Sequence, residues 1–109
     1  MEAAAIEEIS AGNLVIRPDE LLAHVDGRPL ILTMRELSLL VALARRAGRV
    51  VAREELYAVV WQQPYRPCER SVDVYVAKLR QKLEEAAPDW RYIHTHFGLG
   101  YRFDARRAA

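Results

Sequence analysis

Basic, small polar and apolar side chains share one side of a predicted helix between Arg70 and Leu83, and this mixture suits contact with a nucleic acid. Four apolar residues recur at helical spacing and predict a stripe that packs on a core, namely Val72, Val76, Leu79 and Leu83. The opposite side would present Arg70, Ser71, Val74, Ala77, Lys78 and Gln81. Cations attract phosphates, and small or apolar groups can reach base edges and thymine methyls. The pattern predicts a recognition helix, with an amphipathic surface helix whose charged face is merely solvated as the alternative.

The composition indicates what kind of protein carries this helix. The chain has 109 residues, 51% of them hydrophobic, which is enough for one domain with a single core. Residues 1–20 carry five acids and one arginine, a charge of −4, so the total of +1 leaves +5 on residues 21–109. A basic body is compatible with a nucleic-acid partner. The single cysteine excludes an internal disulfide, and there is no signal-peptide pattern or long apolar run, so we expect a cytoplasmic protein without a membrane segment.

The beginning of the chain predicts a small antiparallel sheet. Short apolar segments alternate with turn-forming residues, at residues 6–9, 14–17, 22–25 and 29–32. The pair Asp26-Gly27 between two of these segments indicates a type I′ hairpin turn, which needs positive φ at both central residues.

A first helix is expected directly after this sheet. Thr33 and Glu36 have the spacing of a capping box, in which each side chain bonds to the backbone of the other residue. Apolar residues then continue at helical spacing until Gly48, a favourable residue just beyond a helix end. The predicted helix runs from Met34 to about Ala47.

Two further helices and an irregular loop complete the helical part. The second helix is expected from Arg53 to about Trp61, with acids in its first turn but the poor capping residue Ala52 before it. The third, which carries the stretch described above, is expected from about Glu69 to Ala86, before Pro88. Two prolines make residues 62–69 a loop longer than a compact bundle requires, and such loops often carry a contact.

A β-hairpin is predicted after the third helix. Two strand-like runs are separated by a turn with two glycines, and the three segments are Tyr92–His96, residues 97–100 and Tyr101–Asp104. Residues 49–51, between the first two helices, are expected to be no more than a strand-like link. Arg106 and Arg107 are expected to form a frayed tail.

The order of these elements is that of a winged helix-turn-helix domain. Four segments, at residues 32–40, 50–61, 70–83 and 93–103, resemble the C-terminal output domain of OmpR/PhoB-type response regulators. The resemblance covers residues 6–104, with residues 1–5 as a linker remnant or free end and residues 105–109 as a tail. It implies an α+β fold with an N-terminal four-stranded antiparallel sheet, three helices and a C-terminal β-hairpin wing.

The resemblance also implies how such a domain would bind DNA. Arg70 and Ser71 match positions that contact the DNA backbone, and Val74 and Lys78 match base-facing positions in the major groove. The predicted DNA-binding set is Arg70, Ser71, Val74, Ala77, Lys78, Gln81, Thr95 and Phe97, the last two on the wing near the minor groove. At Ala77 and Phe97 the family often has a basic residue, so both departures remove a cation from the DNA side.

The implied function is sequence-specific binding of double-stranded promoter DNA and regulation of transcription in a two-component phosphorelay system. The implied partners are direct-repeat DNA bound in tandem, a receiver domain, a sensor kinase and RNA polymerase, which the loop would contact through Gln63, Tyr65 and Arg66. No receiver domain lies within these residues, so the chain is expected to be an excised output domain or a single-domain regulator. The alternative function is a winged-helix protein-interaction module with weak DNA binding.

Other chemistry finds little support in the sequence. His94 and His96 share a face of a predicted strand, but together with Cys68 they are too few for a structural zinc, and we expect no metal or other cofactor. No nucleophile motif or phosphate loop indicates an enzyme. Asp73 and the pair Glu84-Glu85 are expected to be solvated.

The aromatic residues Trp61, Trp90, Tyr101 and Phe103 are expected to pack in the core or the wing rather than to stack on bases. We expect the Phe97 side chain to pack back on the sheet. The alternatives are an apolar contact with the sugar edges of a groove and wedging between base steps, which would bend the DNA sharply.

Overall fold

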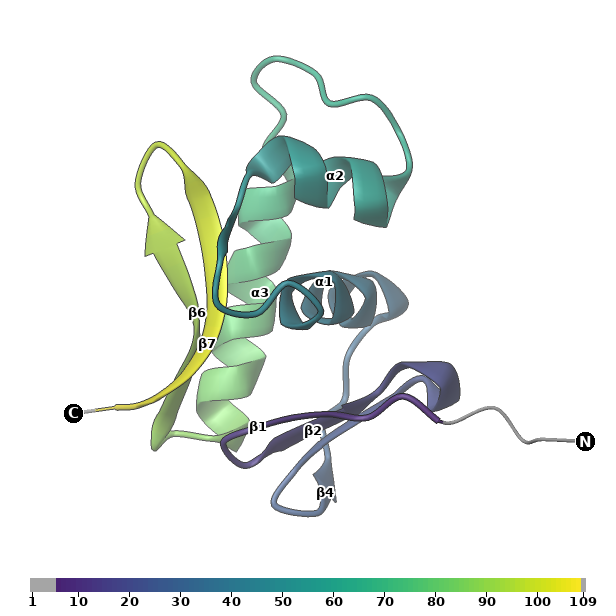
Figure 1. The fold of residues 1–109 in the computed structure, drawn as a ribbon, viewed down its shortest axis with the longest axis vertical. Helices are drawn as coiled ribbons and strands as arrows, with labels where there is room; N and C mark the ends of the chain where they lie inside the picture. The colour runs from purple at the N-terminus through teal and green to yellow at the C-terminus, as the bar shows by residue number, and fades with distance from the viewer. Residues whose placement is uncertain (1–5, 109) are drawn as a thin grey trace, which may run out of the picture.

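Two antiparallel sheets flank three helices in the computed structural model, which describes residues 6–108 (Figure 1). The expected linker at residues 1–5 and the last residue lie outside the described residues. None of the helices within residues 6–108 is long and apolar enough to cross a lipid bilayer.

The N-terminal sheet has the predicted four strands in the order β1-β2-β3-β4. The strands are β1 (Ile9–Ala11), β2 (Leu14–Arg17), β3 (Leu22–Val25) and β4 (Arg28–Pro29), with a 3-10 turn, η1 (Pro18–Glu20), between β2 and β3. Alternate residues of β2 and β3 are buried, as expected for a sheet with one face on the core.

The two outer strands do not lie where the sequence predicted them, at residues 6–9 and 29–32. The predicted turn is present, with φ of +50° at Asp26 and +77° at Gly27, and this two-residue turn places Arg28 opposite Val25. The β1–β2 turn is equally short and pairs Ala11 with Leu14. Turn length therefore sets the register of both hairpins and moves β1 and β4 toward their turns.

Helix α1 (Met34–Ala44) begins with the predicted capping box. The Glu36 amide donates to Thr33 Oγ1 at 3.2 Å, and the Thr33 amide donates to Glu36 Oε1 at 2.8 Å. The predicted end at Ala47 was wrong, because two tight turns with bonds between residues three apart follow Ala44. Gly48, with φ of +88°, then donates its amide to the Phe103 carbonyl and leads the chain toward the second sheet.

Helix α2 (Arg53–Trp61) has the predicted bounds, and no side chain caps its start at Ala52. Helix α3 (Ser71–Ala86) begins two residues later than predicted. Glu69 lies outside α3 because its carboxylate accepts hydrogen bonds from the Ser71 amide at 3.1 Å and the Ser71 hydroxyl at 2.6 Å. It thus supplies an acceptor at the helix start instead of forming part of the first turn.

The wing belongs to a three-stranded sheet in the order β5-β7-β6. Its strands are β5 (Val50–Val51), β6 (Trp90–His96) and β7 (Gly100–Arg107). The short link before α2, expected to be no more than strand-like, is a two-residue strand that pairs with the start of β7. A Cβ at Gly100 would lie 2.0 Å from the Val51 carbonyl oxygen, so this close approach of the two strands requires glycine.

The prediction of a frayed tail at Arg106 and Arg107 was wrong. Arg107 pairs with Trp90 in the β6–β7 ladder, and its guanidinium lies 4.7 Å from the centroid of the Trp90 ring. This backbone pairing and cation–π contact hold the segment that was expected to be free.

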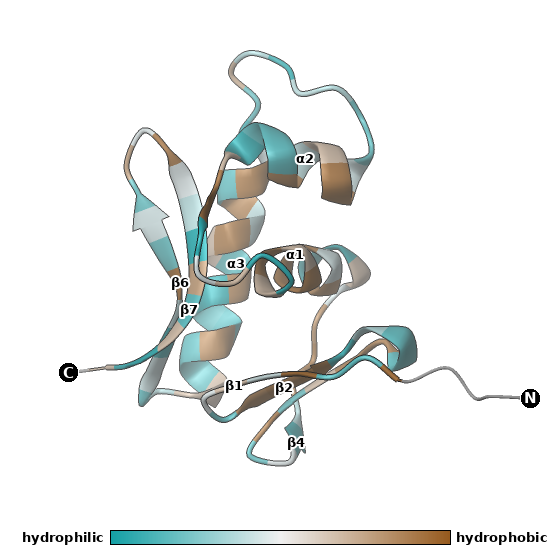
Figure 2. Cartoon of the chain, viewed as in Figure 1, coloured by the Kyte–Doolittle hydropathy of each residue, from teal (hydrophilic) through white to brown (hydrophobic). Residues whose placement is uncertain are grey.

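The inner stripe of α3 is buried as predicted, with Val72, Val76, Leu79 and Leu83 each 2% exposed or less. These residues pack in one cluster with leucines of α1 and with Phe103 of β7. Figure 2 shows apolar segments on the helices and on the first sheet where these elements face one another. Burial of a side chain of this size contributes about 1.5–3 kcal/mol, so the stripe fixes how α3 is turned about its axis.

Candidate nucleic-acid interface

The outer face of α3 brings together most of the residues that the sequence placed there, but Ser71 is half-buried and its hydroxyl is bonded to the Glu69 carboxylate. Val74 is 47% exposed, and Ala77, Lys78 and Gln81 are also exposed along the helix. Arg70 is exposed at the N-cap position, and no ion pair to it occurs within residues 6–108. Cations, methyl groups and an amide therefore share a surface whose orientation is fixed by the buried stripe.

Lys78 has an aromatic neighbour. Its ammonium lies 4.8 Å from the centroid of the Tyr75 ring, one turn earlier on α3. Gln81 donates to Glu85 at 3.3 Å, an exposed contact that an external partner can replace. The positive charge of Lys78 is not neutralised by a carboxylate within the described residues.

Arg80 connects α3 to the wing. Its Nη1 donates to the Ile93 carbonyl at 3.2 Å and to Thr95 Oγ1 at 3.0 Å, and its guanidinium lies 5.9 Å from the centroid of the Tyr101 ring. The predicted site residue Thr95 is therefore half-buried and bonded to α3. This brace fixes β6 relative to the outer face of α3.

Asp73 joins three elements, and the prediction that it is a solvated charge was wrong. It accepts a hydrogen bond from Arg53 Nε of α2 at 2.7 Å and another from the Tyr101 hydroxyl of β7. Burial by itself raises the pKa of Asp73, but the bonds from Tyr101 and Arg53 outweigh it and hold the pKa below its ordinary value. Burial and the Asp73 carboxylate raise the pKa of Tyr101. The carboxylate thus ties α2, α3 and the wing together.

The other predicted solvated acids lie on the surface. Glu84 forms an ion pair with Arg91 at 3.5 Å, with both side chains more than 40% exposed. Glu85 is exposed. Such contacts contribute little to stability.

Phe97 does not pack back on the sheet, as the sequence had led us to expect. Its side chain is 91% exposed, and Leu99 beside it is 66% exposed. A tight turn, in which the Leu99 amide donates to the His96 carbonyl at 2.9 Å, ends the hairpin. The end of this hairpin stands clear of the helices (Figure 1), which agrees with the exposure of the Phe97 side chain.

The expected contact loop between α2 and α3 is only partly available to a partner. Tyr65 is half-buried, lies edge-on to Tyr57 at 5.6 Å and donates its hydroxyl to the Glu69 carbonyl at 3.2 Å. Its role as an exposed anchor was therefore predicted wrongly, because the aromatic cluster draws it inward. Gln63 and Arg66 are exposed.

The aromatic residues expected to pack do so, to different degrees. Tyr101 and Phe103 are buried, whereas Trp61 and Trp90 are partly buried against the core. On β6, His94 Nε2 lies 2.8 Å from the Asp104 carbonyl oxygen of the neighbouring strand. Within residues 6–108 no three metal-binding side chains gather.

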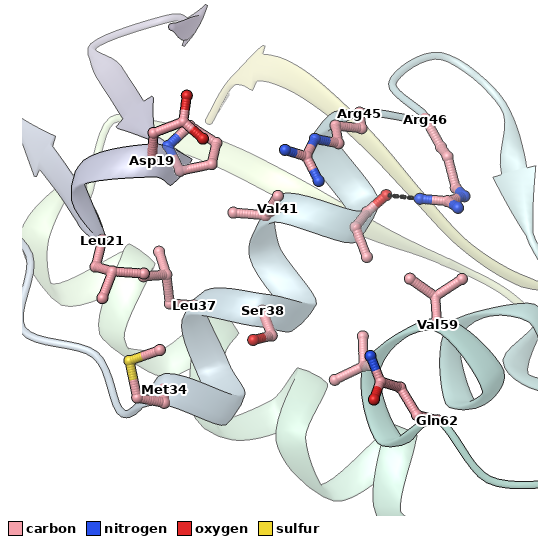
Figure 3. A pocket seen from close by; sticks show the side chains of 13 residues that line it. Asp19, Leu21, Met34, Leu37, Ser38, Val41, Arg45, Arg46, Val59 and Gln62 are labelled. Atoms are coloured by element: carbon pink, nitrogen blue, oxygen red, sulfur yellow. Dashed lines mark hydrogen bonds between the residues drawn. The ribbon is translucent and has the colours of Figure 1, made fainter. Parts of the chain in front are cut away.

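A groove with a volume of about 420 Å³ lies between η1, α1 and α2 (Figure 3). Leu21, Met34 and Val41 give it apolar walls, and the Arg46 guanidinium at its edge donates to the Ala42 carbonyl. Neither α3 nor the wing lines this groove. It is therefore separate from the surface described above.

Comparison with known proteins identifies the family. The family model described as "Transcriptional regulatory protein, C terminal" matches residues 27–103. The chain belongs to this family. This is a family of transcription-regulator domains, not of enzymes, and the resemblance found in the four sequence motifs is confirmed.

A curated relative and two solved structures show the extent of the similarity. The transcriptional regulatory protein AfsQ1 of Streptomyces coelicolor is 37% identical over 103 residues, which is 94% of this chain and 46% of AfsQ1. The RstA DNA-binding domain of Klebsiella pneumoniae, solved in complex with the RstA box, has a TM-score of 0.81 and 32% identity, over 90% of this chain and 97% of that one. The CpxR DNA-binding domain of E. coli has a TM-score of 0.82 and 32% identity, over 92% and 99%.

These comparisons confirm the winged helix-turn-helix fold. The chain spans less than half the length of the curated relatives it matches.

Proposed function

We propose that this chain binds double-stranded DNA sequence-specifically and regulates transcription, as the output domain of a two-component response regulator. The observation that carries the proposal is the outer face of α3, where Arg70 and Lys78 are exposed, are not paired with a carboxylate in residues 6–108, and flank the exposed methyls of Val74 and Ala77. A helix of this kind fits the major groove, in which donors read base edges and methyl groups meet thymine.

Each part of this face has a distinct role in the proposal. Arg70 and Ser71 at the start of α3 hold phosphates, for which the Ser71 hydroxyl exchanges its bond to the Glu69 carboxylate for one to a phosphate oxygen. Lys78 donates to a base edge, and Val74 and Gln81 complete the contact with neighbouring bases. Since Ala77 brings no charge, affinity depends on few cations.

The wing reaches the minor groove through Phe97 and Thr95 in this proposal. Phe97 offers no charge to the negative potential of a narrow groove, so its contribution is an apolar contact with the sugars. Thr95 has its hydroxyl engaged by Arg80 and acts mainly by holding the hairpin in place.

The remaining partners are proposed on the basis of family membership. They are direct-repeat promoter DNA bound in tandem, a receiver domain with its sensor kinase, and RNA polymerase, whose contact surface would be Gln63 and Arg66. The setting would be the cytoplasm. The domain, expected at residues 6–104, extends to Arg107 because β7 does.

Selection from a pool of random duplexes at low salt tests the proposal. We expect an enriched motif, with weak monomer affinity because few cations contact phosphates, and this affinity should fall as salt rises because each contact releases counterions from the DNA. If no motif is enriched, sequence-specific binding is wrong and the protein-interaction module becomes the better reading.

Two substitutions then test the division of roles along α3. Lys78→Ala should weaken binding by about 1–3 kcal/mol and relax the preference at one base pair. Arg70→Ala also removes one cation, but from the start of the same helix face, and should weaken binding to all duplexes alike. Binding profiles across single-base variants of the selected motif separate the two effects. A uniform loss for Lys78→Ala would contradict its base-reading role.

A further inference from the structure

Tyr75 lies at the border between the buried stripe and the outer face of α3. It is half-buried, and its ring faces the ammonium of Lys78, three residues later, at 4.8 Å from the ring centroid. That distance is within the range of a cation–π interaction. The position of an otherwise flexible lysine side chain is thereby set by a ring.

The Tyr75 ring is itself held from the other side. Trp61 of α2 meets it edge-on at 5.5 Å, with 74° between the ring planes. Trp61 in turn stacks on Tyr57 at 5.2 Å and carries the Arg35 guanidinium 4.9 Å from its centroid. The contacts of Trp61 therefore anchor the Tyr75 ring to α1 and α2, and the ring is a fixed platform for Lys78.

The two lysines of α3 differ in a way that matters for DNA. Lys82 lies 2.6 Å from the buried Glu36 carboxylate, which neutralises its charge. Lys78 is held by an uncharged ring, which restricts where the ammonium lies but leaves its full charge for an external acceptor. Tyr75 thus orients a cation without competing for it as an acid would.

We propose that Tyr75 is a positioning residue that determines sequence specificity, by holding the Lys78 ammonium opposite one base pair. This role of Tyr75 rests on the proposed DNA binding, and it identifies the residue that narrows the base preference of that binding. An unrestrained lysine reaches acceptors on neighbouring base pairs through its flexible stem, whereas a restrained one selects among them. Loss of the ring should therefore broaden base preference more than it weakens binding.

Two substitutions and one control separate this role from support of the fold. Tyr75→Leu removes the ring but keeps an apolar side chain, and Tyr75→Phe keeps the ring. Tyr65→Leu makes the same change to a half-buried tyrosine of the same aromatic cluster that does not contact Lys78. For each protein, binding to all single-base variants of the selected motif is measured, together with the NMR shift of the Lys78 ε-methylene protons without DNA and the melting temperature.

In Tyr75→Leu we expect about a two- to fivefold loss of preference at the base pair that Lys78→Ala also relaxes, with nonspecific affinity retained. The upfield ring-current shift of the Lys78 protons should disappear. Tyr75→Phe should keep both properties, and Tyr65→Leu should keep both despite a lower melting temperature. Adding Tyr75→Leu to Lys78→Ala should relax that base pair no further.

Four results would overturn the proposal. Lys78 protons with the same shift in wild type and Tyr75→Leu would mean that the ring does not hold the lysine. An equal loss of affinity for every sequence in Tyr75→Leu would reduce Tyr75 to a structural role. If the wild type itself enriches no motif, the proposed function fails and the specificity role fails with it, whereas retained preference in Tyr75→Leu refutes the role of Tyr75 alone.

Discussion

Two regions of the molecule treat their cations differently. In the support region, residues 6–61, most arginines pair with carboxylates, namely Arg17, Arg45, Arg46, Arg49 and Arg53. In the α3–wing region, residues 62–108, most cations have no ion pair among the described residues, namely Arg66, Arg70, Lys78, Arg80, Arg102 and Arg107. A net charge of +1 therefore conceals a surface on which positive charge is available to a partner.

The difference shows what each set of charges does. In the support region the pairs connect segments that are separate in sequence, as Arg45 does with Glu7 and as Arg46 and Arg49 do with Glu55. In the α3–wing region Lys78 and Arg107 contact aromatic rings and Arg80 contacts neutral oxygens, and these contacts orient the cations and leave the charge in place. Paired charges should thus affect stability, and unpaired ones should affect binding.

The largest expected effect separates the two faces of α3 within the α3–wing region. Val76→Asp places a carboxylate where the side chain is 0% exposed and should destabilise the domain by more than about 4 kcal/mol. Val74→Asp, on the 47% exposed outer face, should fold normally but repel phosphates and lose DNA binding. Thermal unfolding followed by circular dichroism, together with DNA titration, checks both. An unfolded Val74→Asp would show that the outer face is needed for folding.

A second prediction concerns the pair that joins the two regions, Glu36 and Lys82. Burial opposes the charged form of Glu36, yet bonds from Lys82 and Thr33 hold its pKa below the ordinary value. Glu36→Ala leaves the Thr33 amide and Lys82 without their acceptor and should lower the free energy of unfolding by about 2–4 kcal/mol, with DNA affinity unchanged. Urea unfolding measures the loss. Glu85→Ala, an exposed acid of α3, is the control and should change stability by less than about 0.5 kcal/mol.

A smaller effect depends on pH and tests the paired charges of the support region. Bonds from Arg49 and Arg46 lower the pKa of Glu55 from 4.5 to about 2. Since the folded pKa is depressed, the stabilisation by Glu55 is fully present above pH 4.5 and is lost as the pH falls toward about 2. The carboxylate is 36% exposed, so solvent screening limits the effect to about 1 kcal/mol or less.

Glu55→Gln should therefore differ most from wild type near neutral pH and converge with it in acid. Urea unfolding across this pH range measures the difference. Glu54→Gln is the control, because it changes an exposed acid of the same helix turn. Its difference in unfolding free energy from the wild type should not show this pH dependence. A constant difference between wild type and Glu55→Gln at all pH values would refute the assignment.

The smallest stability effect is expected at the wing tip. Phe97 is 91% exposed, so Phe97→Ala should leave the melting temperature almost unchanged and weaken DNA binding only through lost sugar contact. Phe97→Arg adds an unpaired cation to the α3–wing region. It should raise the salt dependence of binding by about one ion and favour A·T pairs beside the major-groove site. Titrations on duplexes with A·T or G·C flanks test this, and indifference to both salt and flank would show that the wing does not reach the groove.

Local sequence signals predicted much of this fold because they act over a few residues. The capping box of Thr33 and Glu36, the Asp26-Gly27 turn and the buried stripe of α3 all lie where their patterns indicated. Strand and helix ends were less predictable. The path of the chain after α1 depends on a bond from Gly48 to the distant Phe103, and the extent of β7 depends on pairing with Trp90.

The candidate site, too, was predictable from local patterns only in part. Periodicity alone placed Val74, Lys78 and Gln81 on one exposed face. It could not show that Tyr65 turns inward or that Phe97 stands free, because each outcome depends on which surfaces from other elements lie nearby. The bond from Arg80 to Thr95 was invisible for the same reason.

The sequence by itself determined which residues form α3, which of its sides is buried and which motifs identify the family, since helical periodicity and turn chemistry are local properties. Only the tertiary structure decided which charges remain available. Asp73 meets Arg53 and Tyr101, Lys82 meets Glu36, and Lys78 meets a ring, through contacts that cross between elements or depend on how side chains pack. The sequence gives the number of cations. The tertiary structure determines which group each cation contacts, because an ion pair requires its two charges to lie within a few ångströms.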